Sequence, residues 1–100
     1  MLVAFSISPT ATAEDGSVSE AVAAAVRVVE GSGLPWELTS MFTTVEGEWD
    51  EVMEVVRRAV EVVSAVSPRT SLVLKADIRP GYDGQLTSKV ERVRSLLDEG

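Results

Sequence analysis

Apolar and polar residues recur along this chain with two different periods. A two-residue alternation, typical of β-strands, covers short stretches at residues 2–8, 36–38, 41–45 and 71–78. Apolar residues at helical spacing cover longer stretches at residues 17–30, 50–66 (a start at Glu48 fits equally) and 87–98. The resulting order, β-α-β-β-α-β-α, predicts an α+β, ferredoxin-like sandwich. Its helices cover one face of an antiparallel four-stranded sheet, and a further helix follows at the C-terminus.

The alternation also predicts which side chains point toward the helices and which point to the opposite face of the sheet. The inward set is apolar: Phe5, Ile7, Trp36, Leu38, Leu72, Leu74 and Ile78. The outward set is polar: Ser6, Ser8, Glu37, Thr39, Lys75 and Asp77. Beyond Thr39 a bulge would exchange the two faces, so two assignments stay open. Either Met41, Thr43 and Val45 point outward, or Phe42, Thr44 and Glu46 do.

The outward sheet face permits two interpretations. It is either a plain solvated face, or a surface that binds something. Ala4 and Val73 are interspersed with its hydroxyl groups and charges. A half-apolar face of this kind suits a subunit interface or a small polar ligand, whose ring nitrogens and amino group the polar side chains can recognise.

Composition removes several kinds of chemistry. One hundred residues make a single domain, residues 1–100, and 45% hydrophobic content is enough for a core. The sequence has no Cys, His or Asn. This excludes disulfides, thiolate nucleophiles, Cys-ligated metals, Ser-His-Asp triads and N-glycosylation sites.

Charge bears on the partner and the compartment. Nine Lys and Arg against sixteen Asp and Glu give a net charge of −7. This argues against nucleic acid or an anionic membrane as partner and tolerates a cationic ligand. The first apolar run is too short for a membrane span and has no basic segment before it. A cytoplasmic location is therefore expected.

Three further features have a structural and a functional interpretation. The acidic run Glu46, Glu48, Asp50 and Glu51 suits the start of a helix better than a metal site. Lys75 and Asp77 on one strand face resemble a structural or ligand-anchoring pair more than an acid–base pair. Trp49 is expected to plug the core rather than to stack on a ligand ring.

Two stretches of the sequence carry a family resemblance. The first is Phe5-Ser6-Ile7 followed by Pro9. The second is the run Glu-Leu-Thr-x-Met-x-Thr-x-x-Glu-Gly at residues 37–47, followed by Glu48-Trp49-Asp50-Glu51-Val52. Together with Lys75-x-Asp77-x-Arg79, they make the chain resemble the small thiamine-binding protein family, related to the YkoF thiamine/hydroxymethylpyrimidine-binding proteins. The sequence departs from that pattern at Ser40, often Pro in the family, and at Phe42, often Gly.

The resemblance implies a ferredoxin-like fold whose subunits pair through their sheets, as dimers or dimers of dimers. It also implies binding of thiamine or its pyrimidine moiety without turnover. With the face argument it yields the candidate ligand-binding residues Ser6, Ser8, Glu37, Thr39, Met41, Thr43, Glu46, Lys75 and Asp77.

The function expected from the sequence is therefore non-catalytic. The protein would be a cytoplasmic homo-oligomer that binds thiamine or hydroxymethylpyrimidine on or near the sheet face at a subunit interface. It would need no cofactor, no metal, no nucleic acid and no membrane. Two alternatives are an oligomeric structural or regulatory sensor module for another small ligand, and an enzyme that uses Lys75 or a carboxylate.

Overall fold

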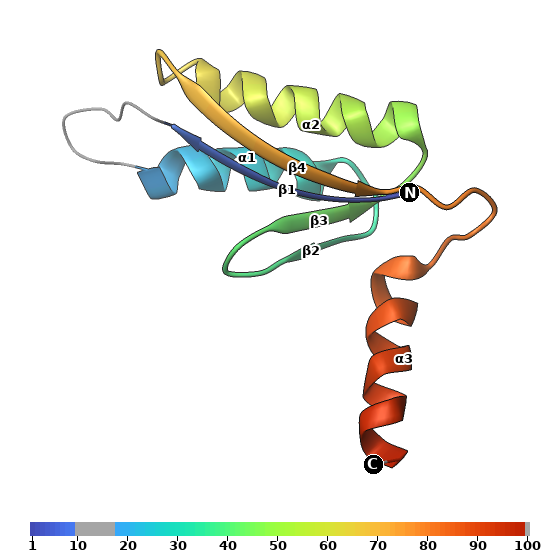
Figure 1. Cartoon of the computed structure of the whole chain (residues 1–100). Coiled ribbons are helices and arrows are strands. Elements are labelled where there is room, and N and C mark those ends of the chain that lie inside the picture. Colours follow the sequence, from blue (N-terminus) through green and yellow to red (C-terminus); the bar gives the residue numbers. More distant parts are fainter. Residues whose placement is uncertain (10–17, 100) are drawn as a thin grey trace.

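The computed structural model describes residues 1–9 and 18–99 as a two-layer sandwich with one projecting helix (Figure 1). In chain order the elements are β1 (Leu2–Pro9), α1 (Val18–Gly31), β2 (Trp36–Leu38), β3 (Thr43–Glu46), α2 (Trp49–Ser64), β4 (Thr70–Asp77) and α3 (Gln85–Glu99). The small and polar residues of 9–16 predict a loop, and Ser17 with Glu20 has the spacing of a capping box, but residues 10–17 lie outside the described residues. Within the described residues, no helix has both the length and the apolar content that a membrane span requires.

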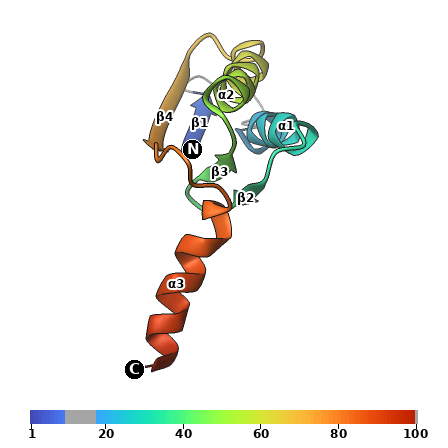
Figure 2. The same cartoon turned by 90° about the vertical axis from the view of Figure 1, so that its right-hand side faces the viewer.

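The four strands form one sheet in the order β2-β3-β1-β4. Every pairing is antiparallel, and β1 is central, next to β3 on one side and β4 on the other. Helices α1 and α2 lie side by side on one face of this sheet, as Figure 2 shows from the end. This order and layering are those of the ferredoxin-like sandwich, so the predicted fold is confirmed.

The core lies between the sheet and these two helices. From β1 it takes Val3, Phe5 and Ile7, which alternate with less buried residues as a strand with one covered face requires. From α2 it takes a stripe at helical spacing: Val52, Val55, Val56, Ala59 and Val63. Valine is a mediocre helix former, so this helix depends on the burial of its stripe more than on intrinsic propensity.

The connection between β2 and β3 decides which residues face the helices. The backbone N–H of Thr39 donates to the carbonyl of Phe42 at 2.9 Å, and Leu38 pairs with Thr43 across the hairpin. This tight turn keeps Thr43 and Val45 on the side of Phe5, where both are buried. Thr44 and Glu46 therefore belong to the open face, which settles the alternative that the sequence left open.

The third helix leaves the sandwich. Figures 1 and 2 both show α3 running away from the sheet, beyond the β2 edge. None of its residues is buried, although Val90, Val93, Leu96 and Leu97 are apolar. Within the described chain, α3 is attached only around its first turns.

Several boundaries and one core assignment differ from the prediction. Helix α2 ends at Ser64 rather than near Pro68, so Val66 lies beyond it and is exposed. β3 begins at Thr43 because the turn takes up Met41 and Phe42. Trp49 does not plug the core: its position at the start of α2 leaves 55% of its surface exposed.

Candidate functional site

A pocket of about 250 Å³ opens between the sheet and α1, at the end where β1 finishes. Phe5 and Ile7 of β1 form its sheet side, and Val22, Ala25 and Val26 of α1 form the opposite wall. The β2–β3 turn closes one end, with Leu38, Thr39, Ser40, Met41, Phe42 and Thr43 around it. The volume lies just below the usual range of ligand sites, about 300–1,000 Å³, and fits a single small ring.

Thr43 supplies the hydroxyl that the sheet side of this pocket presents. It is 7% exposed and shares its face with the buried Val45. Within the described chain its hydroxyl has no hydrogen-bond partner, although the residue borders the pocket. A hydroxyl beside apolar side chains is a directional contact for a ring nitrogen or an amino group.

The turn residues contribute differently. The Thr39 hydroxyl donates to the Phe42 carbonyl at 3.0 Å and accepts from the Phe42 amide at 3.2 Å. It thereby stabilises the turn and holds the end wall of the pocket in place. Met41 is 73% exposed at the tip of the turn, where it lies at the rim of the pocket.

Five of the nine predicted site residues border this pocket: Ser6, Ser8, Thr39, Met41 and Thr43. The sequence placed ligand binding on or near the open face, whereas this pocket lies on the helix-covered side. Ser6 and Ser8 pair with Val73 and Ser71, so the alternation of β1 assigns their side chains to the open face. Ser6 and Ser8 therefore border the pocket as part of the end of β1, and not through side chains that point into it.

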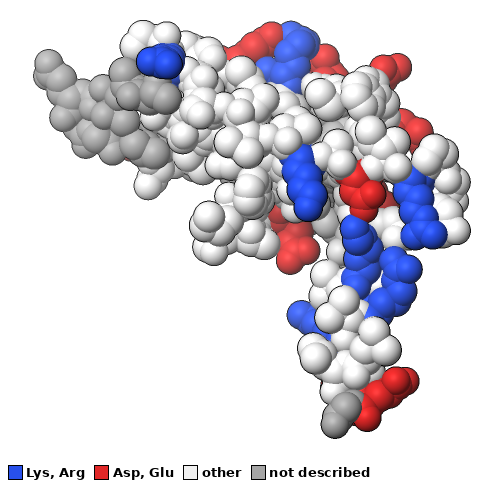
Figure 3. Space-filling model, in the orientation of Figure 1, with Lys and Arg blue, Asp and Glu red and all other residues white. Residues whose placement is uncertain are grey.

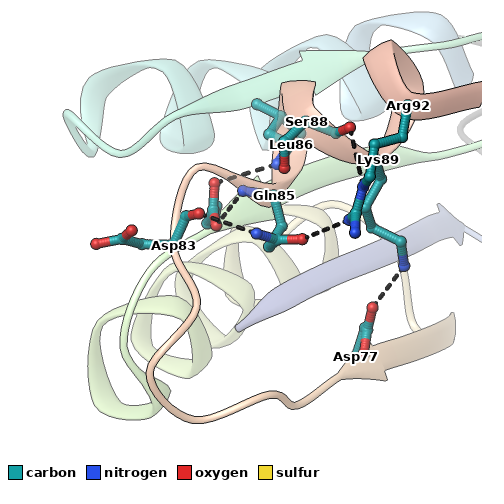
Figure 4. A network of polar contacts seen from close by, with 8 residues as sticks. Asp77, Asp83, Gln85, Leu86, Ser88, Lys89 and Arg92 are labelled. Carbon is teal, nitrogen blue, oxygen red and sulfur yellow. Dashed lines mark hydrogen bonds and ion pairs between the residues drawn. The ribbon is translucent and has the colours of Figure 1, made fainter. Parts of the chain in front are cut away.

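Glu46 lies at the other end of the sheet and is engaged by α3. Glu46 is on the open face but only 5% exposed, because the first turn of α3 covers it. It accepts the backbone N–H of Gln85 at 2.9 Å and of Leu86 at 3.3 Å. These two donors have no partner inside the helix, so Glu46 acts as its N-terminal cap from a distant strand (Figure 4).

Asp77 forms a second attachment of the same helix. The Lys89 ammonium donates to its carboxylate at 2.5 Å, and both side chains are about half exposed. This hydrogen bond, the Lys89 charge, and weaker contributions from Arg79 and Lys75 lower the pKa of Asp77 below its usual range. The partner of Asp77 is therefore Lys89, not Lys75, although both cations stand near it.

Lys75 and Glu37 complete the set of nine without joining the pocket. Both are exposed on the open face, Lys75 opposite Ala4 and Glu37 opposite Thr44. The predicted residues thus fall into a group of five at the pocket and a group of four at the open face.

Sequence reasoning missed the α1 wall as part of the pocket. Val22, Ala25 and Val26 carry the ordinary periodicity of a core-facing helix, and nothing in that pattern separates a pocket wall from packed core.

The acidic run at residues 46–51 has helix-capping roles. Glu48 and Glu51 form a capping box at the start of α2, where Asp50 lies in the first turn.

Known proteins resemble the chain over nearly its whole length. The model of a family described as "Thiamine-binding protein" matches residues 3–94. The UPF0045 protein Mb1933 of Mycobacterium bovis is 50% identical over 98 residues, 97% of this chain and 94% of that protein. A UPF0045 protein of Methanothermobacter thermautotrophicus is 41% identical over 83 residues, 81% of this chain and 84% of the relative.

Solved structures share the fold. The hypothetical protein MJ1052 of Methanocaldococcus jannascii superposes with a TM-score of 0.83 at 27% identity, covering 93% of this chain and 94% of that one. TM0486 of Thermotoga maritima gives a TM-score of 0.75 at 26% identity, covering 91% and 97%. The description of TM0486 links it to thiamine biosynthesis or salvage. From its matched sequence and shared fold, this chain belongs to the thiamine-binding protein family.

Proposed function

We propose that this protein binds thiamine or its hydroxymethylpyrimidine moiety in the pocket between β1, the β2–β3 turn and α1, without turning it over. The observation that carries the proposal is the pocket itself, a ring-sized cavity of about 250 Å³ with apolar walls and the partly buried Thr43 hydroxyl. Family membership and the description of TM0486 supply the class of ligand.

The pocket chemistry suits the pyrimidine end of thiamine. A flat aromatic ring fits between Phe5 and Ile7 on one side and the valines of α1 on the other. Thr43 and the backbone groups at the end of β1 provide hydrogen bonds to ring nitrogens and the exocyclic amino group. The cationic thiazolium then points to solvent, where the net charge of −7 is favourable.

Absence of turnover is supported by what borders the cavity. None of the described residues that line it is ionisable, so no group there is suited to transfer a proton at neutral pH. The carboxylates of Glu46 and Asp77, both predicted site residues, instead accept hydrogen bonds from α3. The proposal therefore assigns binding, not chemistry, to the pocket.

We also propose that the protein works as a homo-oligomer and that α3 takes part in assembly. Leu86, Val90, Val93 and Leu97 recur at four- and three-residue steps, the spacing of a helix–helix seam. The last three are 45%, 57% and 72% exposed within one chain. A second copy is a fitting partner for this stripe because it presents the same apolar residues.

Calorimetric titration of thiamine and of hydroxymethylpyrimidine tests the ligand assignment. Thr43→Val removes the hydroxyl and keeps the shape, and we expect affinity to fall about tenfold, the cost of one buried hydrogen bond. The matched control is Thr44→Val, the next residue on the opposite face, which should bind normally. No binding by the unaltered protein at millimolar ligand, or equal losses in both variants, would overturn the assignment.

A sensor or structural module for another small ligand remains the second candidate. It is favoured by the exposed apolar residues of α3, which call for assembly whatever the pocket holds. An oligomer that binds neither thiamine nor hydroxymethylpyrimidine would support it.

A further inference from the structure

A second, smaller cavity lies where α3 meets the open face of the sheet. Its volume is about 130 Å³. Its lining comes from the start of β1, the end of β4, the loop that follows and α3: Met1, Leu2, Asp77, Arg79, Tyr82, Gln85, Lys89 and Arg92. It shares no residue with the ring-sized pocket, which borders the other end of β1.

Three cationic side chains line this cavity, against one carboxylate. Lys89 pairs with Asp77, which leaves the two guanidinium groups. Arg79 stacks on the Tyr82 ring, 3.6 Å from its centroid, and Arg92 bonds to neutral oxygens of Gln85 at 3.1 Å and Ser88 at 3.4 Å. Neither arginine forms an ion pair within residues 1–9 and 18–99.

Glu46 and Asp83 also carry carboxylates near this corner, and neither forms an ion pair with Arg79 or Arg92 among the described residues. Both oxygens of Glu46 are occupied by the backbone N–H groups at the start of α3. Figure 4 shows Arg92 and Lys89 pointing to the same side of the helix, where Arg92 meets the side chain of Gln85, the first residue of α3. The guanidinium groups therefore keep free donors at the cavity.

This concentration of positive charge stands out against the rest of the chain. Five of the nine Lys and Arg residues of a chain with net charge −7 fall between residues 75 and 94. Figure 3 shows blue side chains gathered where α3 leaves the sheet. A local positive field in an acidic protein is a feature that attracts a small anion.

We propose that this cavity, which we call the α3 corner, binds a phosphate group, either free or as the phosphate of a small ester. Arginine presents planar paired donors that match phosphate oxygens, and the Tyr82 ring limits the motion of the Arg79 donors. The cavity, about 130 Å³, has about half the volume of the ring-sized pocket, which suits a phosphoryl group better than a ring. The assignment does not depend on thiamine binding.

The test is a titration of the full chain at low ionic strength with inorganic phosphate and with phenyl phosphate, followed by ³¹P NMR and calorimetry. We expect saturable binding of at least one probe, which weakens as salt is added. Binding of both probes identifies the phosphate group itself as the ligand, and binding of phenyl phosphate alone identifies an ester.

Two variants and a matched control locate the site. Arg92→Gln and Arg79→Gln should each weaken binding about tenfold or more, the loss expected for a charge-assisted hydrogen bond. Arg58→Gln removes the same charge from the exposed side of α2 and should leave affinity within about twofold. The proposal is overturned if the unaltered protein binds neither probe at 10 mM, or if Arg58→Gln weakens binding as much as the other two.

Discussion

The Glu46 carboxylate and the Gln85 backbone amide, 39 residues apart, form a 2.9 Å hydrogen bond that fixes α3 to the sheet. One oxygen accepts from Gln85 and the other from Leu86, so a strand residue caps a helix that has no buried residue of its own. The start of α3 thus depends on a long-range contact rather than on a local capping residue.

We predict that Glu46→Ala loosens the first turns of α3 and leaves the sandwich folded. The loss of a helix cap costs about 0.5–2 kcal/mol, and the amides of Gln85 and Leu86 should exchange with solvent faster. Hydrogen exchange followed by NMR measures this directly. Glu37→Ala, an exposed carboxylate removed from the same face, serves as the control and should leave both amides unchanged.

A second prediction concerns acid. The pKa of Asp77 is lowered chiefly by its hydrogen bond from Lys89. Above the unfolded carboxyl value of about 3.9, Asp77 is ionised in both states and the stabilising contact is complete. As pH falls through the lower folded pKa, Asp77 takes up a proton and the contribution is lost.

An NMR titration of the Asp77 carboxyl group checks this. Its midpoint should lie below the usual aspartate value and rise towards it in Lys89→Gln. Lys75→Gln should raise it less, because Lys75 is the weakest of the cationic influences on Asp77. Equal shifts in the two variants would count against the assigned pairing.

The core stripe of α2 supports a third prediction. Val63 is fully buried between α2 and the sheet, whereas Val66, three residues on, is 65% exposed. Val63→Ala leaves a cavity and should lower the free energy of unfolding by about 1–3 kcal/mol. Val66→Ala should change it by less than about 0.5 kcal/mol. Urea unfolding of both variants gives the comparison, and similar losses would contradict the described packing.

A fourth prediction addresses α3 and assembly. Val93 is 57% exposed within one chain, so Val93→Asp should cost a monomer little. If its stripe contacts a second copy, the new charge is buried there and the oligomer should dissociate. Sedimentation measures the mass of both species. Ser95→Asp adds the same charge outside the stripe and should keep the parent mass; an unchanged mass for Val93→Asp would exclude this stripe from the interface.

The fold could be predicted because each core element repeats one simple pattern. Val3, Phe5 and Ile7 alternate along β1, and Val52 to Val63 recur at helical spacing along α2. These periods report burial directly. The same reasoning failed for Trp49, the first residue of α2. Whether such a residue is buried depends on the chain that packs beside the start of the helix, and here Trp49 is exposed.

The candidate site was predictable only in part. The sheet face on which Thr43 lies depends on how many residues the β2–β3 turn contains. The sequence leaves this number open, and the hydrogen bonds between Thr39 and Phe42 fix it. The role of Glu46 depends on the path of residues 78–84, which returns α3 to a strand far away in sequence. Three-dimensional contacts of this kind leave no local pattern.

The attachment of α3 by its first turn makes this helix a lever. Fifteen residues at 1.5 Å each extend it about 22 Å, so a tilt of ten degrees at Glu46 would move its far end by roughly 4 Å. Its own chain does little to fix that angle. Contacts with neighbouring molecules can therefore set the direction of α3, while the sandwich that carries the pocket between β1 and α1 stays as it is.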